Sequence, residues 1–124
     1  MKILVSDATP HNRQNLAAYL TQSGLNVIAT AATGAETFKL VEAFTPDIII
    51  LDINLPDVEI FEFIAELQKA NQASMVILLM ISFDPAVEQR GLQAGAYTCL
   101  AKNDGIDPLI HAIQQIQLNF NQGA

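Results

Sequence analysis

The sequence has little of three things that define whole classes of protein: cysteine, basic residues and long apolar runs. Its 124 residues include one cysteine, Cys99, so a framework of internal disulfides is excluded. The longest purely apolar runs, 48–51 and 75–81, are far shorter than the roughly 18 residues of a membrane-spanning helix. The first apolar run meets Asp7 too early to be a secretory signal peptide. We therefore expect a cytoplasmic protein with no place in a membrane.

Positive charge is scarce, with 6 lysines and arginines against 13 aspartates and glutamates, and the formal net charge is −7. Domains that bind nucleic acid directly normally carry a basic patch that neutralises phosphates. Six scattered cations cannot form such a patch, which argues against direct nucleic-acid binding and against attachment to anionic lipid. The 51% of apolar residues and 15% of charged residues exclude an intrinsically disordered chain.

What the sequence does contain is a regular alternation of short apolar runs and segments with helical spacing. The runs lie at 3–5, 27–31, 48–53, 76–81 and 97–101, and three of them are continuous, as in strands buried on both faces of a parallel sheet. The apolar spacing within 109–120 indicates an amphipathic last helix. The pattern predicts an α/β domain, doubly wound, with a five-stranded parallel sheet and helices on both faces.

Local signals mark where helices begin, and one predicted helix is weak. Three pairs place a capping side chain before a proline: Thr9-Pro10, Asp84-Pro85 and Asp107-Pro108. The helix at 84–94 has few large apolar anchors, and Gly91 inside it costs ~1 kcal/mol relative to alanine. Low local stability suits a switching element, but an ordinary exposed helix fits equally well. We predict one domain over 1–120 and a polar tail over 121–124.

Polar side chains follow four of the predicted strands. Asp7 follows the first, Asp52 the third, Ser82 the fourth and Lys102 the fifth. Ligands of open parallel sheets bind outside the carboxyl ends of the strands, so these groups should converge. Taken singly, each could be a turn, cap or surface residue. Together they suit phosphoryl transfer, in which a carboxylate takes the phosphoryl group as an acyl phosphate and cations neutralise its charge.

Magnesium is the divalent cation that such a site would use. It takes oxygen ligands, and the carboxylates of Asp7 and Asp52 and a backbone carbonyl near Asn54 could supply some of them. These three positions are therefore the candidate metal ligands.

Three segments of the sequence resemble the receiver domain of two-component response regulators. They are KILVSDATPHNR, PDIIILDINLPD and ISFDPAVEQRGLQAGAYTCLAKND, within a likeness that covers Lys2 to about Phe120. The short spacing from Ser82 to AGA, and Lys-Asn in place of Lys-Pro, look more like receivers that precede LuxR-type helix-turn-helix outputs.

The resemblance implies a fold, a role for each candidate residue and a set of partners. The fold would be flavodoxin-like, (βα)5. Asp52 would be the phosphoacceptor, Lys102 the lysine that neutralises the phosphoryl group, Ser82 the switch hydroxyl and Asp7 a metal-site acid. The phosphoryl donor would be a sensor histidine kinase or a phosphotransfer protein, and a downstream output domain or protein would respond. Such a domain is a signalling module rather than an enzyme, and two copies could pair.

Three positions depart from the family pattern. Ala8 stands where relatives carry a second acid that binds magnesium, so we predict weak magnesium binding. Glu59 could substitute for that acid, although a place at the start of the third helix suits it better. Ile60 replaces a usual glycine. Cys99 replaces the aromatic switch residue, and its apolar surroundings favour a small buried filler over a reactive thiol.

Two alternative functions remain beside the phosphoacceptor reading. The first is a pseudo-receiver, which uses the same fold as a binding module without phosphorylation, and Ala8 and Cys99 motivate it. The second is a flavodoxin-like redox enzyme. That enzyme would need a hydroxyl-rich phosphate loop after the first strand, where DATPHN offers only Thr9 and places a proline where amides are wanted.

Overall fold

The computed structural model describes residues 1–122, which alternate strands and helices from end to end. The strands are β1 (Lys2–Ser6), β2 (Asn26–Ala31), β3 (Ile48–Asp52), β4 (Met75–Met80) and β5 (Thr98–Ala101). The helices are α1 (Pro10–Gln22), α2 (Gly34–Phe44), α3 (Ile60–Ala70), α4 (Pro85–Ala94) and α5 (Asp107–Gln122), with a short 3-10 turn, η1 (Lys102–Asp104), before α5. All strand pairs are parallel in the order β2-β1-β3-β4-β5, which confirms the predicted fold.

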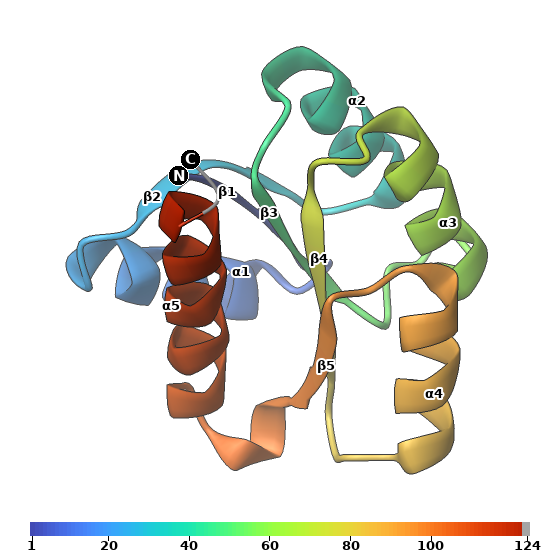
Figure 1. The fold of residues 1–124 in the computed structure, drawn as a ribbon. Helices are drawn as coiled ribbons and strands as arrows, with labels where there is room; N and C mark the ends of the chain where they lie inside the picture. Colours follow the sequence, from blue (N-terminus) through green and yellow to red (C-terminus); the bar gives the residue numbers. More distant parts are fainter. Residues whose placement is uncertain (123–124) are drawn as a thin grey trace.

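Helices cover both faces of the sheet, as Figure 1 shows. α1 and α5 lie on one face, and α2, α3 and α4 lie on the other. Alternate residues of each strand enter the two layers, since successive side chains of a strand point to opposite faces. In β3, for example, Ile48 and Ile50 pack with α1 and α5, whereas Ile49 and Leu51 pack with α2 and α3.

The continuous apolar runs became the buried centre of the sheet. All five residues of β3 are buried, and so are the last five of β4. β2 lies at the edge of the sheet and is mostly half-exposed, as its mixed composition suggests. Because β1, β3 and β4 lie side by side, the residues that follow them emerge at neighbouring points of one edge.

One of the three helix-start signals, Asp84-Pro85, acts fully as predicted, whereas α5 begins at Asp107 itself, which is therefore not the residue before the helix. Pro10 and Pro85 begin α1 and α4, and the carboxylate of Asp84 accepts a hydrogen bond from the Ala86 amide. Thr9 occupies the capping position of α1, but its side chain makes no capping hydrogen bond. Its backbone amide donates instead to Asp7 Oδ1 at 2.9 Å, so this residue helps to fix an acid rather than the helix.

The predicted end of the domain differs slightly from the helix that forms there. α5 continues to Gln122, two residues into the segment that we expected to be a polar tail. Residues 123–124 lie outside the described part of the chain. None of the helices within 1–122 is both long and apolar enough to cross a membrane.

α4 approaches the sheet unusually closely at one residue. Gly91 is buried, and a Cβ atom placed on it would lie 2.6 Å from Cys99 Sγ and 3.2 Å from Leu78 Cδ2. The Cys99 thiol, 3.8 Å from the Glu88 carbonyl, points back at the same helix. Gly91 is therefore a packing requirement, and the small residue at position 99 is its counterpart on β5.

We expect Gly91→Ala to destabilise the domain even though alanine favours helices by ~1 kcal/mol over glycine. Overpacking typically costs about 1–3 kcal/mol, and the added methyl group would overlap the Cys99 sulfur. Adding Cys99→Ala should recover part of the loss, because it removes the atom nearest to the new methyl group. Urea unfolding of the two single variants and the double variant measures this coupling. A Gly91→Ala protein as stable as the wild type would contradict the packing argument.

Candidate functional site

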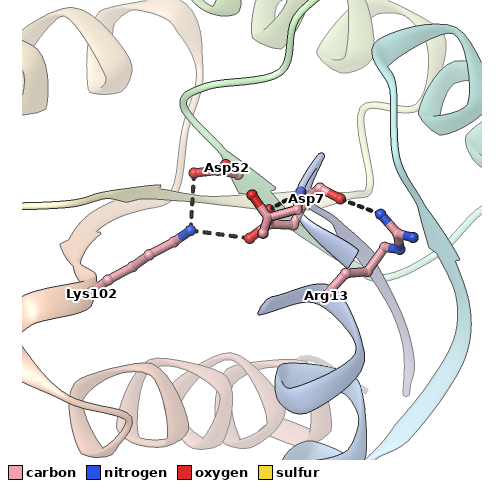
Figure 2. A network of polar contacts seen from close by, with 5 residues as sticks. Asp7, Arg13, Asp52 and Lys102 are labelled. Atoms are coloured by element: carbon pink, nitrogen blue, oxygen red, sulfur yellow. Dashed lines mark hydrogen bonds and ion pairs between the residues drawn. The ribbon is translucent and has the colours of Figure 1, made fainter. Parts of the chain in front are cut away.

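Three of the predicted site residues meet at the carboxyl edge of the sheet. Lys102 Nζ lies 3.0 Å from Asp7 Oδ2 and 3.2 Å from Asp52 Oδ1, so one ammonium bridges both carboxylates (Figure 2). Asp7 directly follows β1, Asp52 is the last residue of β3, and Lys102 directly follows β5. The two carboxylate side chains are 4% and 7% exposed, and that of Lys102 is 29% exposed. The site is thus a largely buried triad of two negative groups and one positive group.

Asp7 is fixed by contacts from the loop and the helix that follow it. The Thr9 amide donates to Oδ1 of Asp7, and Lys102 holds Oδ2. Arg13, from the first turns of α1, donates from Nη1 to the Asp7 backbone carbonyl at 2.8 Å (Figure 2). Sequence reasoning missed Arg13. A long cation one helical turn after an acidic loop was the available signal, but the sequence does not reveal the direction of its side chain.

Burial dominates the electrostatics of Asp52. Desolvation raises the pKa of its carboxyl group, the Lys102 ammonium opposes that rise, and the neighbouring Asp7 adds to it, so the pKa lies above its ordinary value. Burial alone would lower the pKa of Lys102, but its hydrogen bond to Asp7 and the charge of Asp52 outweigh that effect and raise it. The two acids thus favour the charged form of Lys102, whereas burial disfavours the charged form of Asp52.

The oxygen chemistry of the site fits a hard divalent cation. Among the buried side-chain nitrogen and oxygen atoms of the described residues, only Asp52 Oδ1 has no hydrogen-bond partner beyond its ion pair with Lys102. Within residues 1–122, however, no group of three or more acidic, histidine or cysteine side chains gathers as a metal cluster. Two carboxylates and nearby backbone oxygen suit magnesium, which keeps several waters.

Ser82 does not join the triad. It lies in the exposed loop between β4 and α4, and its Oγ accepts a hydrogen bond from Asn103 Nδ2 at 2.8 Å. The alternative role of Ser82 as a helix cap also fails, because Asp84 caps α4. The contact with Asn103 could not be read from the sequence, since the two residues are joined only by the packing of β4 beside β5.

The loop after β3 is tied to a distant helix. Asp57 accepts hydrogen bonds from the backbone amides of Gly34 at 2.7 Å and Ala35 at 3.0 Å, at the start of α2. These bonds lower the pKa of the Asp57 carboxyl group. Gly34 permits the approach, because a Cβ atom there would overlap Val58. The clamp fixes the loop that carries Asn54, whose backbone amide also lowers the pKa of Asp52 slightly.

The other unusual positions have structural roles. Glu59 caps α3 by accepting a hydrogen bond from the Glu62 amide at 2.7 Å, and it lies 3.9 Å from Arg90. It is therefore engaged as a cap, as the sequence favoured. Ile60 is buried in the layer of α3. Burial, with the Glu88 charge, raises the pKa of the Cys99 thiol to about 11, which agrees with an inert filler.

Comparison with known proteins identifies the architecture around this triad. The family model of the response regulator receiver domain matches residues 3–114. The chain belongs to this family. The receiver domain is 29% identical over 121 residues to the transcriptional regulatory protein PdtaR of Mycobacterium tuberculosis, covering 98% of this chain and 58% of the relative. It is 30% identical over 118 residues to LnrK of Bacillus subtilis, covering 94% and 53%. The receiver domain thus spans little more than half the length of these relatives.

Solved structures agree with the fold of the receiver domain. The receiver domain of NarL from Mycobacterium tuberculosis superimposes with a TM-score of 0.84 at 27% identity, covering 92% of this chain and 93% of that one. A LuxR-family response regulator from an Aurantimonas species gives a TM-score of 0.88 at 24% identity, covering 95% and 85%. The second likeness supports the fold alone. Receiver domains are signalling modules of two-component systems, and the chain is assigned to that class.

Proposed function

We propose that this receiver domain accepts a phosphoryl group on Asp52 from a sensor histidine kinase or a phosphotransfer protein. The observation that carries the proposal is the Lys102 ammonium between the buried carboxylates of Asp52 and Asp7. A carboxyl group whose burial raises its pKa beside a lysine ammonium is a candidate nucleophile, since perturbed carboxyl groups of this kind concentrate at functional sites.

The transfer exchanges one bond to phosphorus for another. A carboxylate oxygen of Asp52 attacks phosphorus, the bond from phosphorus to the donor histidine nitrogen breaks, and the histidine leaves with the electron pair of that bond. Lys102 supplies the positive charge that the phosphoryl oxygens require. Asp7 positions the lysine. Magnesium, held by Asp7, Asp52 and the backbone carbonyl of Asn54, would neutralise further phosphoryl charge.

The output of the reaction is a changed protein surface. Ser82 turns toward the new phosphate, and the loop before α4 follows it. We propose that a downstream output domain or protein reads this change, that two copies could pair, and that the domain works in the cytoplasm without binding nucleic acid or membrane. Beyond its own phosphorylation and dephosphorylation it has no enzymatic role.

The proposal is tested by incubating the wild-type domain with magnesium and a small phosphoryl donor, and then measuring the intact mass. A gain of one phosphoryl group that hydroxylamine removes would indicate an acyl phosphate. Ala8 and Cys99 favour the second candidate, a pseudo-receiver that acts as a binding module. If neither the small donor nor a panel of phosphorylated kinases labels the folded protein, the pseudo-receiver is the correct assignment.

Restoring the missing acid should strengthen magnesium binding. The triad contributes two carboxylates, and Ala8→Asp places a third beside them in the loop after β1. Loss of even an outer partner of a metal site typically costs 10–100-fold in affinity, so we expect at least ~10-fold tighter magnesium binding and faster phosphorylation at low magnesium. Magnesium titrations followed by the amide chemical shifts near Asp7 and Asp52 compare the two proteins. Equal affinities would show that another group already fills the role.

A further inference from the structure

Two hydrogen bonds join the loop of Ser82 to the turn that follows Lys102. The side-chain amide of Asn103 donates to Ser82 Oγ at 2.8 Å, and the backbone amide of Asn103 donates to the Ile81 carbonyl at 3.0 Å. One residue of η1 thus holds both the backbone and the side chain of the loop after β4. The backbone bond would survive any substitution other than proline, whereas the side-chain bond depends on asparagine.

The side-chain bond engages the hydroxyl that the proposed switch needs. The Ser82 side chain is exposed. Among residues 1–122, the bond from Asn103 is the one hydrogen bond that its hydroxyl makes. Turning the hydroxyl toward a phosphoryl group on Asp52 breaks the bond to Asn103. Ser82 Oγ is the acceptor of this bond, and its proton stays free, so the two positions compete through the place of Oγ, which cannot lie beside Asn103 and beside Asp52 at once.

We propose that Asn103 is a latch that holds Ser82 in its resting position and so sets the cost of switching. The inference rests on the proposed phosphorylation of Asp52 and adds a regulatory residue to it. Asn103 touches neither the phosphoacceptor nor the lysine ammonium in the described contacts, so it is a positioning residue that acts through Ser82.

The surface around the latch explains why its release matters. Ile81 and Phe83, on either side of Ser82, are 58% and 51% exposed. Another hydrogen bond of this loop is weak, because the Asp84 amide donates to Met80 Sδ, at 3.2 Å, and a thioether sulfur is a poor acceptor. Movement of Ser82 therefore rearranges two exposed apolar side chains, and Asn103 is the polar contact that restrains them.

The test is a double-mutant cycle read by the affinity for beryllium trifluoride, a phosphoryl mimic, in the presence of magnesium. Fluorine NMR measures that affinity for the wild type, Asn103→Ala, Ser82→Ala and the double variant. A net hydrogen bond is worth about 0.5–1.5 kcal/mol, so Asn103→Ala should bind the mimic about two- to twelvefold more tightly than the wild type. In the Ser82→Ala background the same substitution should change the affinity less than about twofold, because no hydroxyl remains to be held.

A control and two contrary outcomes complete the experiment. Asn119→Ala removes another exposed asparagine, from the end of α5, and should leave the affinity unchanged. If Asn103→Ala binds the mimic as the wild type does, or changes the affinity equally with and without the Ser82 hydroxyl, the latch is overturned while the phosphoacceptor assignment stands. If the wild type takes up neither mimic nor phosphoryl group, the proposed function fails, and the latch fails with it.

Discussion

Asp52→Asn should abolish phosphorylation of the domain while leaving the fold intact. The amide is nearly the same size as the carboxylate but is not a nucleophile toward phosphorus, so no acyl phosphate can form. Asp7, the other buried carboxylate of the triad, already receives hydrogen bonds from Lys102 and the Thr9 amide and should not replace it. Intact mass after incubation with a small donor and magnesium is the measurement. A phosphoryl adduct that persists in Asp52→Asn would overturn the assignment of the acceptor.

The same variant should be more stable than the wild type at neutral pH. Burial raises the pKa of Asp52, so the folded state binds that proton more tightly than the unfolded state does. The cost of keeping the group ionised is fully present above the folded pKa and disappears as the pH falls below the ordinary value of 3.8. The stability advantage of Asp52→Asn should therefore shrink on acidification. Urea unfolding of both proteins from neutral pH down toward 3.8 measures the difference in their unfolding free energies. A difference that grows as the pH falls would contradict the prediction.

Lys102→Met should be the most destabilising single change at the site. Removing one partner of a buried ion pair typically costs 3–5 kcal/mol, because the remaining charge is left uncompensated. Here two carboxylates that are almost completely buried would lose their shared counter-charge, although the partial exposure of Lys102 favours the low end, about 3 kcal/mol. Urea unfolding should show this loss at neutral pH and a partial recovery on acidification, as a carboxylate takes up a proton.

Magnesium separates the electrostatic cause from simple loss of packing. A divalent cation can replace the missing positive charge, so magnesium should stabilise Lys102→Met more than it stabilises the wild type. Lys39→Met removes an exposed lysine of α2 and should change the stability by less than about 0.5 kcal/mol. If Lys102→Met is as stable as this control, the lysine does not compensate the two acids.

The sequence was sufficient for the sheet and for the meeting of the triad, for a simple physical reason. A continuous run such as 48–51, rich in isoleucine and too short for a helix, favours a buried strand, and parallel strands bring the residues that follow them to one edge. The strand ends alone predict that the triad residues meet, because each lies at the end of its strand or one residue after it: Asp7, Asp52 and Lys102.

The remaining contacts depend on side-chain direction and on the separation of elements, which spacing does not encode. The bond from Asn103 to Ser82 and the clamp of Asp57 on α2 join residues whose neighbourhood arises only after the layers pack. Helix propensity alone marks Gly91 as a weakening residue, whereas in the structure a Cβ atom at this position would overlap the Cys99 sulfur. The propensity argument was valid for an isolated helix and incomplete for a packed one.

The contact between Gly91 and Cys99 also restricts how α4 can move. A shift of the helix by one turn along its axis, toward its C-terminal end, would bring Val87 or Glu88 over the sulfur. Each of these carries a Cβ atom where the sheet leaves no room for one. A slide in that direction is thus blocked, whereas a swing about position 91 keeps the glycine against the sulfur. Such a pivot would give its largest displacement at the Pro85 end, beside the loop of Ser82, and would leave β5 nearly still.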